Sequence, residues 1–205
     1  MSKTIHEIMQ VSPIVPVMVI NNVEHAVPLA NALVKGGLKV LEITLRTDAA
    51  LESIRRIKAE VPDAIVGAGT IINIETLNAA IDAGAEFIVS PGTTDTLIEA
   101  ALKTGVPLLP GVANPSEAMR ITAMKFFPAE AAGGVPMLKS IGAPIPQILF
   151  CPTGGVSQKN VKNYYSLPNV GCVGGSWMCA ANLVEAENWD EITRLAAEAI
   201  ELATN

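Results

Sequence analysis

Residues 36–45 read Gly-Gly-Leu-Lys-Val-Leu-Glu-Ile-Thr-Leu. The two glycines stand where the amphipathic segment 23–35 would end as a helix, and the apolar run after them predicts a strand over 38–45. A helix that passes through a glycine turn into a buried strand is the repeating unit of α/β proteins. This stretch therefore predicts a fold of alternating strands and helices.

The same alternation extends along the chain. The pattern predicts strands over residues 14–20, 38–45, 64–69, 87–90, 107–109, 123–127, 147–150 and 170–173. It predicts helices over 23–35, 49–60, 74–83, 94–103, 115–120, 135–141, 158–165 and 189–203. Glycines that suit helix ends are Gly36, Gly37, Gly84 and Gly105, and residues that suit helix starts are Asn73, Thr93 and Ser157.

Strands such as 15–20 and 87–89 are apolar on both faces, as parallel strands covered by helices outside and packed inside must be. We therefore expect an α/β protein with a single (β/α)8 TIM-barrel domain over residues 1–205, preceded by an N-terminal helical segment within that range. The alternative is an open doubly wound sheet, which is disfavoured because no strand-GxGxxG-helix pattern occurs early in the chain.

Composition excludes several classes of protein. Half of the 205 residues are hydrophobic, 17% are charged and the mean hydropathy is +0.39, which excludes a disordered chain. The net charge of −6 favours neither nucleic acid nor an anionic membrane as a partner, so an anionic ligand must be held locally. The apolar stretch 11–20 contains two prolines and is shorter than the ~20 residues of a membrane span, and no signal-peptide pattern is present. We expect a cytoplasmic protein.

The cysteines and histidines do not suggest a metal centre. Cys151, Cys172 and Cys179 are odd in number and lack CxxC spacing, so they are expected to be buried thiols. His6 and His25 lie far from each other and from any acidic cluster, which disfavours a catalytic triad or a metal site.

Glu42 is the first candidate for chemistry. It shares strand parity with Thr44 and Arg46, whereas Leu41, Ile43 and Leu45 have the opposite parity. If the leucines and Ile43 face the helices, Glu42 points into the barrel, where a carboxylate is costly unless it is paired or functional. Glu42 is then either the partner of an interior cation or a general acid/base.

Lys125 is the second candidate, because lysine is rare in an apolar strand flanked by phenylalanine. If Phe126 faces the helices, Lys125 and Phe127 face the interior. Burial, with a neighbouring Arg46, would then lower the pKa of the lysine and supply a neutral amine that attacks a carbonyl. The alternative is a lysine at a strand end that reaches solvent.

Two glycine-rich turns follow the last two predicted strands: Thr153-Gly154-Gly155 and Gly174-Gly175-Ser176. Turns at these two strand ends hold phosphate in many barrels, because uncrowded backbone N–H groups approach the anion closely. The alternative is that these glycines only form turns. The small residues of 67–70 and 90–92 are expected to leave room for a substrate, to which Thr70 offers a hydroxyl.

With these residues assembled, the sequence resembles the 2-keto-3-deoxy-6-phosphogluconate aldolase / 4-hydroxy-2-oxoglutarate aldolase family over nearly its whole length. The resemblance rests on these stretches, in the family's order: Val40-Leu-Glu-Ile-Thr-Leu-Arg-Thr47, Val66-Gly-Ala-Gly-Thr70, Ser90-Pro-Gly92, Lys125-Phe-Phe-Pro-Ala-Glu130, Pro152-Thr-Gly-Gly155 and Gly174-Gly-Ser-Trp177.

The resemblance implies a Schiff-base aldolase with Lys125 as the Schiff-base lysine and Glu42 as general acid/base. It further implies a pyruvyl end lined by Arg46, Thr70 and Pro91. The phosphate end is implied around Thr153, Gly154, Gly155, Gly174 and Ser176. No metal or other cofactor is implied. The partners would be a keto-acid substrate and two further copies of the chain in a homotrimer, without nucleic acid or membrane.

The implied reaction splits 2-keto-3-deoxy-6-phosphogluconate into pyruvate and glyceraldehyde 3-phosphate, or 4-hydroxy-2-oxoglutarate into pyruvate and glyoxylate. Alternatives are the galactonate epimer as substrate, another phosphate-binding barrel in which Lys125 is only an electrostatic group, and a catalytically silent barrel that serves as an assembly module.

One stretch departs from the family pattern. Residues 117–124, before Lys125, are several residues shorter than the family's fifth helix and its turn require. Because a crossover between parallel strands needs about a dozen residues, the helix is expected to be truncated to about a turn and a half, unless residues are absent from the sequence.

Overall fold

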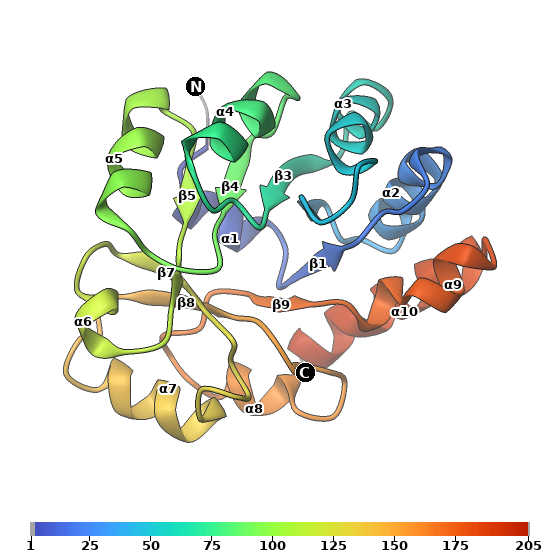
Figure 1. Cartoon of the computed structure of the whole chain (residues 1–205). Coiled ribbons are helices and arrows are strands. Elements are labelled where there is room, and N and C mark those ends of the chain that lie inside the picture. Colours follow the sequence, from blue (N-terminus) through green and yellow to red (C-terminus); the bar gives the residue numbers. More distant parts are fainter. Residues whose placement is uncertain (1–2, 205) are drawn as a thin grey trace.

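The computed structural model describes residues 3–204. Its helices are α1 (Ile5–Val11), α2 (Ala26–Lys35), α3 (Ala50–Glu60), α4 (Ile74–Asp82), α5 (Asp95–Thr104), α6 (Pro115–Ala118), α7 (Gly134–Gly142), α8 (Val161–Tyr165), α9 (Ala181–Glu185) and α10 (Trp189–Thr204), with short 3₁₀ turns η1 (Val23–His25) and η2 (Trp177–Cys179). The strands are β1 (Ile14–Met18), β2 (Val40–Thr44), β3 (Ile65–Gly69), β4 (Phe87–Val89), β5 (Leu108–Leu109), β6 (Gly111–Val112), β7 (Ala123–Phe126), β8 (Leu149–Pro152) and β9 (Val173–Gly175). Figure 1 shows the longer helices around the outside of the strands.

The predicted α/β fold with parallel strands is confirmed, but the strands form two ladders. One sheet has the order β5-β4-β3-β2-β1-β9 and the other the order β6-β7-β8, and all their pairings are parallel. The two sheets meet at Pro110, which separates β5 from β6 and has no N–H to donate to a ladder. On the other side, β8 reaches the β9 region through the isolated bridges Phe150↔Val170 and Thr153↔Gly174.

Helix starts and ends follow the sequence signals with two corrections. Asn73 caps α4 as predicted, and Gly105 ends α5 in the left-handed conformation. The N-cap of α5 is Thr94 instead of Thr93, whose hydroxyl donates to the Gly111 carbonyl across the sheet. The predicted helix at 158–165 begins later, after Asn160. Ser157 is therefore not its cap, because the Ser157 N–H donates to the Asn160 side chain in a turn.

The fifth helix is truncated, as its short sequence predicts. Helix α6 has only four residues, and Asn114 caps it before the chain enters β7. Leu102 on α5 is 75% exposed, and Met119, which directly follows α6, is 73% exposed.

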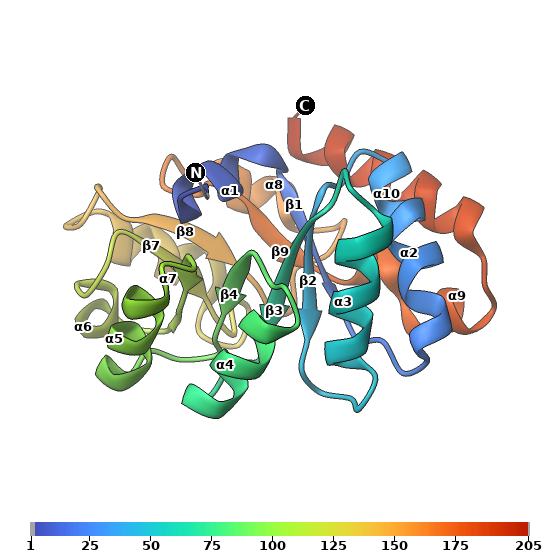
Figure 2. The ribbon, with the colours of Figure 1, turned by 90° about the horizontal axis from the view of Figure 1, so that it is seen from above.

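The apolar residues form an outer and an inner core. Leu41, Ile43 and Phe126 belong to the outer cluster between strands and helices. The inner cluster consists of alternate strand residues together with α1 residues and comprises Ile8, Met9, Val15, Val40, Phe87, Val89, Leu109, Ala123, Cys151 and Cys172. Figure 2 shows α1 and both chain ends at the end from which the strands start. The predicted parity of β2 is therefore confirmed, and one end of the interior is closed by α1.

An aromatic ring packs directly against Gly67. A Cβ at Gly67 would lie 2.2 Å from the Phe87 ring, so its small size makes room for Phe87 and not for a substrate. Gly67→Ala is expected to lower the free energy of unfolding by about 1–3 kcal/mol, because the buried ring must move. Urea denaturation measures this, and Gly92→Ala, where a Cβ would meet nothing within 4 Å, is the matched control. Equal effects of the two changes would contradict the packing argument.

Candidate active site

A buried ion pair lies at the centre of the fold. The Lys125 Nζ donates to the Glu42 Oε1 at 3.0 Å and lies 3.4 Å from Oε2. Lys125 is 6% exposed and Glu42 is 3% exposed. The sequence prediction that both side chains face the interior is confirmed, and the alternative of a lysine that reaches solvent is wrong.

Neighbouring strands make room for this pair. On β2, Glu42 lies between Val17 of β1 and Gly67 of β3 in the register. A Cβ at Gly69 would lie 2.2 Å from the Glu42 Oε1, so this glycine is needed for the carboxylate to turn toward Lys125. The small residues of β3 were expected to leave room for substrate, but Gly69 makes room for the Glu42 carboxylate.

A thiol side chain of β8 lies beside Lys125. Cys151 is its register partner, and the Cys151 Sγ lies 3.7 Å from the Thr153 Oγ1. The hydrogen bond with Cys172, with a smaller contribution from the charge of Lys125, lowers the pKa of the Cys151 thiol. The pKa of Cys172 is raised well above its ordinary value by the same hydrogen bond and by burial. Together with Cys179, these are buried free thiols, as predicted.

The residues predicted for the pyruvyl end lie at the carboxyl ends of the strands. The Arg46 Nε donates to the Thr70 Oγ1 at 3.3 Å, which joins the ends of β2 and β3. Thr70 has a φ of +64°, a conformation that costs a residue with a Cβ about 1–2 kcal/mol. Pro91 is exposed in the loop after β4. The Phe127 ring lies with its centroid 5.3 Å from the Lys125 Nζ.

The two glycine stretches lie next to each other, as predicted, but only the first is a turn after its strand. Gly174 and Gly175 belong to β9, which begins at Val173, so the predicted strand over 170–173 lies too early in the chain. The bridge Thr153↔Gly174 joins them, and a Cβ at Gly174 would lie 2.2 Å from the Thr153 Oγ1. Gly154 and Gly155 have φ values of +101° and +80°, which glycine adopts without a Cβ penalty. Gly175 is buried and Ser176 is exposed at the end of β9.

Two residues of the quoted motifs received no role from the sequence, although the structure gives them one. A Cβ at Gly175 would lie 2.0 Å from the Trp177 ring, whose Nε1 is buried without a partner in the part of the chain that the structure describes. Glu130 accepts the Tyr164 hydroxyl and packs against Gly155. In the sequence, Trp177 and Glu130 were marked only by their places in the motifs Gly174–Trp177 and Lys125–Glu130.

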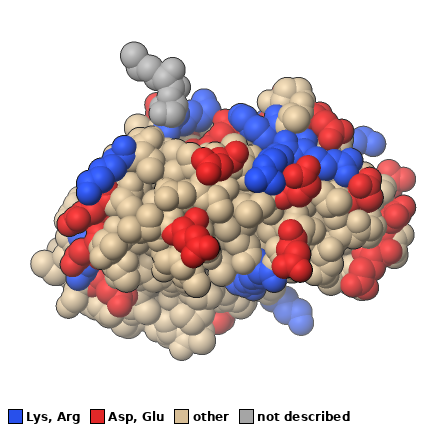
Figure 3. Space-filling model, turned by 45° about the horizontal axis from the view of Figure 1, so that its top comes forward, with Lys and Arg blue, Asp and Glu red and all other residues tan. Residues whose placement is uncertain are grey.

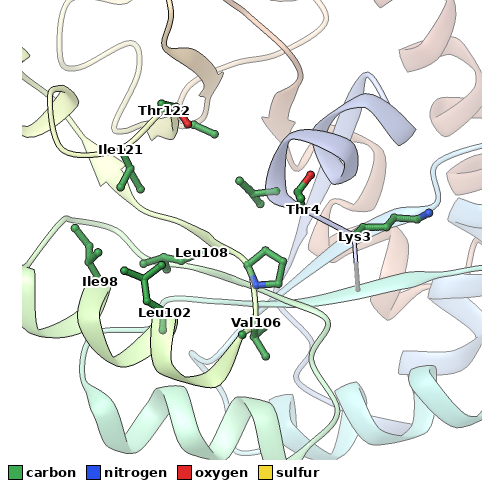
Figure 4. Close-up of a pocket in the computed structure, with 13 residues that line it drawn as sticks. Lys3, Thr4, Ile98, Leu102, Val106, Leu108, Ile121 and Thr122 are labelled. Carbon is green, nitrogen blue, oxygen red and sulfur yellow. The ribbon is translucent and has the colours of Figure 1, made fainter. Parts of the chain in front are cut away.

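Other surface features do not belong to this site. The pocket in Figure 4, of about 330 Å³, lies between α5, the starts of β5 and β7, and residues 3–5, and neither Lys125 nor Glu42 lines it. Figure 3 shows acidic and basic side chains interspersed over the face that it presents. Within residues 3–204, no helix is long and apolar enough to cross a membrane, and no group of three or more His, Cys, Asp or Glu residues is placed to hold a metal ion.

Comparison with known proteins decides the family. The family model described as KDPG and KHG aldolase matches residues 5–195. This chain belongs to the KDPG and KHG aldolase family. The 2-dehydro-3-deoxy-phosphogluconate aldolase of Pseudoalteromonas atlantica is 55% identical and the match covers 92% of this chain and 90% of that protein. The KHG/KDPG aldolase of Escherichia coli is 50% identical, with 95% of this chain and 93% of that protein covered.

Solved structures of KDPG aldolases have the same fold. The enzyme of Legionella pneumophila, with pyruvate captured as a covalent carbinolamine intermediate, matches with a TM-score of 0.92 and 46% identity over 95% of this chain and 97% of that chain. The Zymomonas mobilis enzyme, with 3-phosphoglycerate, matches with a TM-score of 0.92 and 45% identity over 98% of this chain and 97% of that chain. The resemblance deduced from the sequence motifs is therefore confirmed.

Proposed function

We propose that this member of the KDPG and KHG aldolase family is a Schiff-base aldolase that cleaves 2-keto-3-deoxy-6-phosphogluconate to pyruvate and glyceraldehyde 3-phosphate. The observation that carries the proposal is the buried Lys125–Glu42 pair at 3.0 Å, because it places an amine next to a proton acceptor in the interior of the fold. The same chemistry would cleave 4-hydroxy-2-oxoglutarate to pyruvate and glyoxylate.

Schiff-base formation uses the proton that the pair shares. Transfer of a proton from the Lys125 Nζ to the Glu42 carboxylate leaves a neutral amine, which attacks the C2 carbonyl of the substrate. A proton then moves from the nitrogen to the former carbonyl oxygen and gives the neutral carbinolamine. When protonated Glu42 gives its proton to that hydroxyl, water leaves and a cationic iminium remains beside the Glu42 carboxylate.

Cleavage of the C3–C4 bond follows from the iminium. Glu42, directly or through one water, takes the proton of the C4 hydroxyl, and C4 becomes the aldehyde carbon of the product. The electron pair of the C3–C4 bond forms the C2=C3 double bond of an enamine, and the electrons of the iminium return to nitrogen. Glu42 then protonates C3, and hydrolysis releases pyruvate and regenerates Lys125. Lys125, Glu42 and water supply and accept every proton in these reaction steps, and no step requires a metal.

The two ends of the substrate would be held by different groups. Arg46, which contacts Thr70, would bind the carboxylate at the pyruvyl end together with Thr70 and Pro91, and Phe127 would cover the keto carbon next to Lys125. At the other end, the backbone N–H groups of the Thr153–Gly155 and Gly174–Ser176 turns would bind the phosphate. This arrangement predicts that only the phosphorylated substrate depends on the turns.

We also propose the architecture that the sequence analysis anticipated. The two parallel sheets would close through Pro110 and the β8–β9 bridges into one (β/α)8 barrel, and residues 1–205 would form a single domain. Membership of the family supports a homotrimer that works in the cytoplasm on a small-molecule substrate.

Borohydride trapping tests the proposal. Borohydride added with pyruvate is expected to reduce the iminium and fix a pyruvyl adduct on Lys125, which mass spectrometry of the intact protein and of its peptides measures. The exposed Lys103 and Lys139 serve as internal controls in the same digest. An unchanged intact mass in folded protein would contradict a Schiff-base mechanism, and an adduct at Lys139 or Lys103 would contradict the site.

A further inference from the structure

Tyr164 and Glu130 form a contact that the reaction steps do not use. Tyr164 lies on α8 with its side chain fully buried, and its hydroxyl donates to the Glu130 Oε1 in the loop after β7. Burial, together with this hydrogen bond, holds the pKa of Tyr164 above its ordinary value. The hydroxyl therefore stays protonated and remains a donor at neutral pH.

Glu130 in turn contacts the first glycine turn. A Cβ at Gly155 would lie 2.7 Å from both the Cβ and the Cγ of Glu130, so the stem of the glutamate lies directly against this residue. The Glu130 N–H donates to the Gly154 carbonyl at 3.0 Å. Glu130 thus holds the turn by its backbone and by its side chain.

The next carbonyl of the turn is held by Asn160. The Asn160 Nδ2 donates to the Gly155 carbonyl at 3.1 Å, and the Asn160 Oδ1 accepts the Ser157 N–H at 2.8 Å. Both carbonyls of the two glycines are therefore bonded to the protein.

Fixing these carbonyls also fixes the N–H groups. In a trans peptide the C=O and the N–H point in opposite directions, so the N–H groups of Gly155 and Val156 point away from Glu130 and Asn160. Within residues 3–204, neither N–H donates to a protein acceptor. Two successive free N–H groups in a glycine turn are the kind of donors with which backbone binds an anion.

We propose that Tyr164 and Glu130 are positioning residues that hold the Gly154–Gly155 turn in its phosphate-binding shape. This inference rests on the proposed function, because it takes the turn as the phosphate end of the site. A carboxylate beside an anion site would repel the anion if it turned toward it. The Tyr164 hydroxyl holds the Glu130 carboxylate toward α8, and the loop contributes its peptide groups to the site.

Tyr164→Phe tests the proposal with the loss of one oxygen atom. We expect the KM for 2-keto-3-deoxy-6-phosphogluconate to rise about tenfold with kcat nearly unchanged, and competitive inhibition by inorganic phosphate to weaken by the same factor. The KM for 4-hydroxy-2-oxoglutarate, which has no phosphate, is expected to stay the same. The matched control is Tyr165→Phe, which removes the hydroxyl that donates to the Pro13 carbonyl near the start of β1 and should leave the ratio of the two KM values unchanged.

A second pair of variants separates position from charge. Glu130→Gln keeps the Cβ and Cγ that contact Gly155 and an oxygen that accepts from Tyr164, so it should stay close to the parent protein. Glu130→Ala keeps the Cβ but removes the Cγ and the oxygen that accepts from Tyr164, and it is expected to raise the KM for the phosphorylated substrate about tenfold. If both variants lose phosphate affinity equally, charge and not position is responsible, and the proposal is overturned.

The outcomes distinguish the inference from the proposed function. If the parent protein forms the pyruvate adduct and is inhibited by phosphate, but folded Tyr164→Phe keeps both KM values within about twofold, only the inference is overturned. Equal increases in both KM values for Tyr164→Phe also overturn it, because the contact would then shape the whole site. If the parent protein forms no pyruvate adduct, the proposed function fails and the inference falls with it.

Discussion

Lys125→Met is expected to lower kcat/KM by about 10⁴-fold or more and to abolish the borohydride-trapped pyruvate adduct. Methionine has a similar length and no amine, so no carbinolamine can form and the C3–C4 electrons have no iminium to enter. Assays of pyruvate release and of the intact mass after trapping measure the two effects. Lys139→Met, on the exposed part of α7, is the matched control and should leave both unchanged.

The same change should also affect stability. Glu42 is 3% exposed, and its carboxylate would lose its cation. Removing one partner of a buried ion pair costs about 3–5 kcal/mol of unfolding free energy, which urea denaturation measures. Activity within tenfold of the parent protein, in folded Lys125→Met, would contradict both the mechanism and the site.

Glu42→Gln is expected to lower kcat by about 10²-fold or more while adduct formation with pyruvate remains detectable. Glutamine keeps the shape of the side chain and an oxygen that accepts from the Lys125 Nζ, but it cannot take the C4 hydroxyl proton. Steady-state kinetics with the phosphorylated substrate and trapping with pyruvate separate the two steps.

Glu86→Gln provides the control for Glu42→Gln. Glu86 is also a carboxylate in an ion pair, with Lys58 at 2.9 Å, but it precedes β4 and lies outside the site. Its substitution should leave kcat unchanged. If Glu42→Gln kept activity within a few-fold, the carboxylate would serve only as the partner of an interior cation.

Features that depend on neighbours along the chain could be predicted from the sequence. Strand parity placed Glu42 and Lys125 on interior faces, because side chains alternate along a strand whatever it packs against. The glycine turns after the last strands were placed side by side, because parallel strands end at the same edge. The short stretch before Lys125 predicted the truncated α6, because chain length limits a crossover.

Features that depend on contacts across the fold were predicted less well. Gly67 and Gly69 were expected to leave space for a substrate, but that space holds the Phe87 ring and the Glu42 carboxylate. Thr93 is not a helix cap because Gly111, on a neighbouring strand, takes its hydroxyl. Each of these errors has the same origin, since the partner is distant in sequence and nothing local indicates it.

The sequence by itself determined the alternation of strands and helices, the inward direction of the chemical side chains and the family to which the chain belongs. Only the tertiary structure decided which of those side chains meet. Glu42 and Lys125 are 83 residues apart, and Glu130 and Tyr164 are 34 apart. The physical reason is that periodicity and turn chemistry act over a few residues, whereas these contacts form only when packing brings separate strands and helices together.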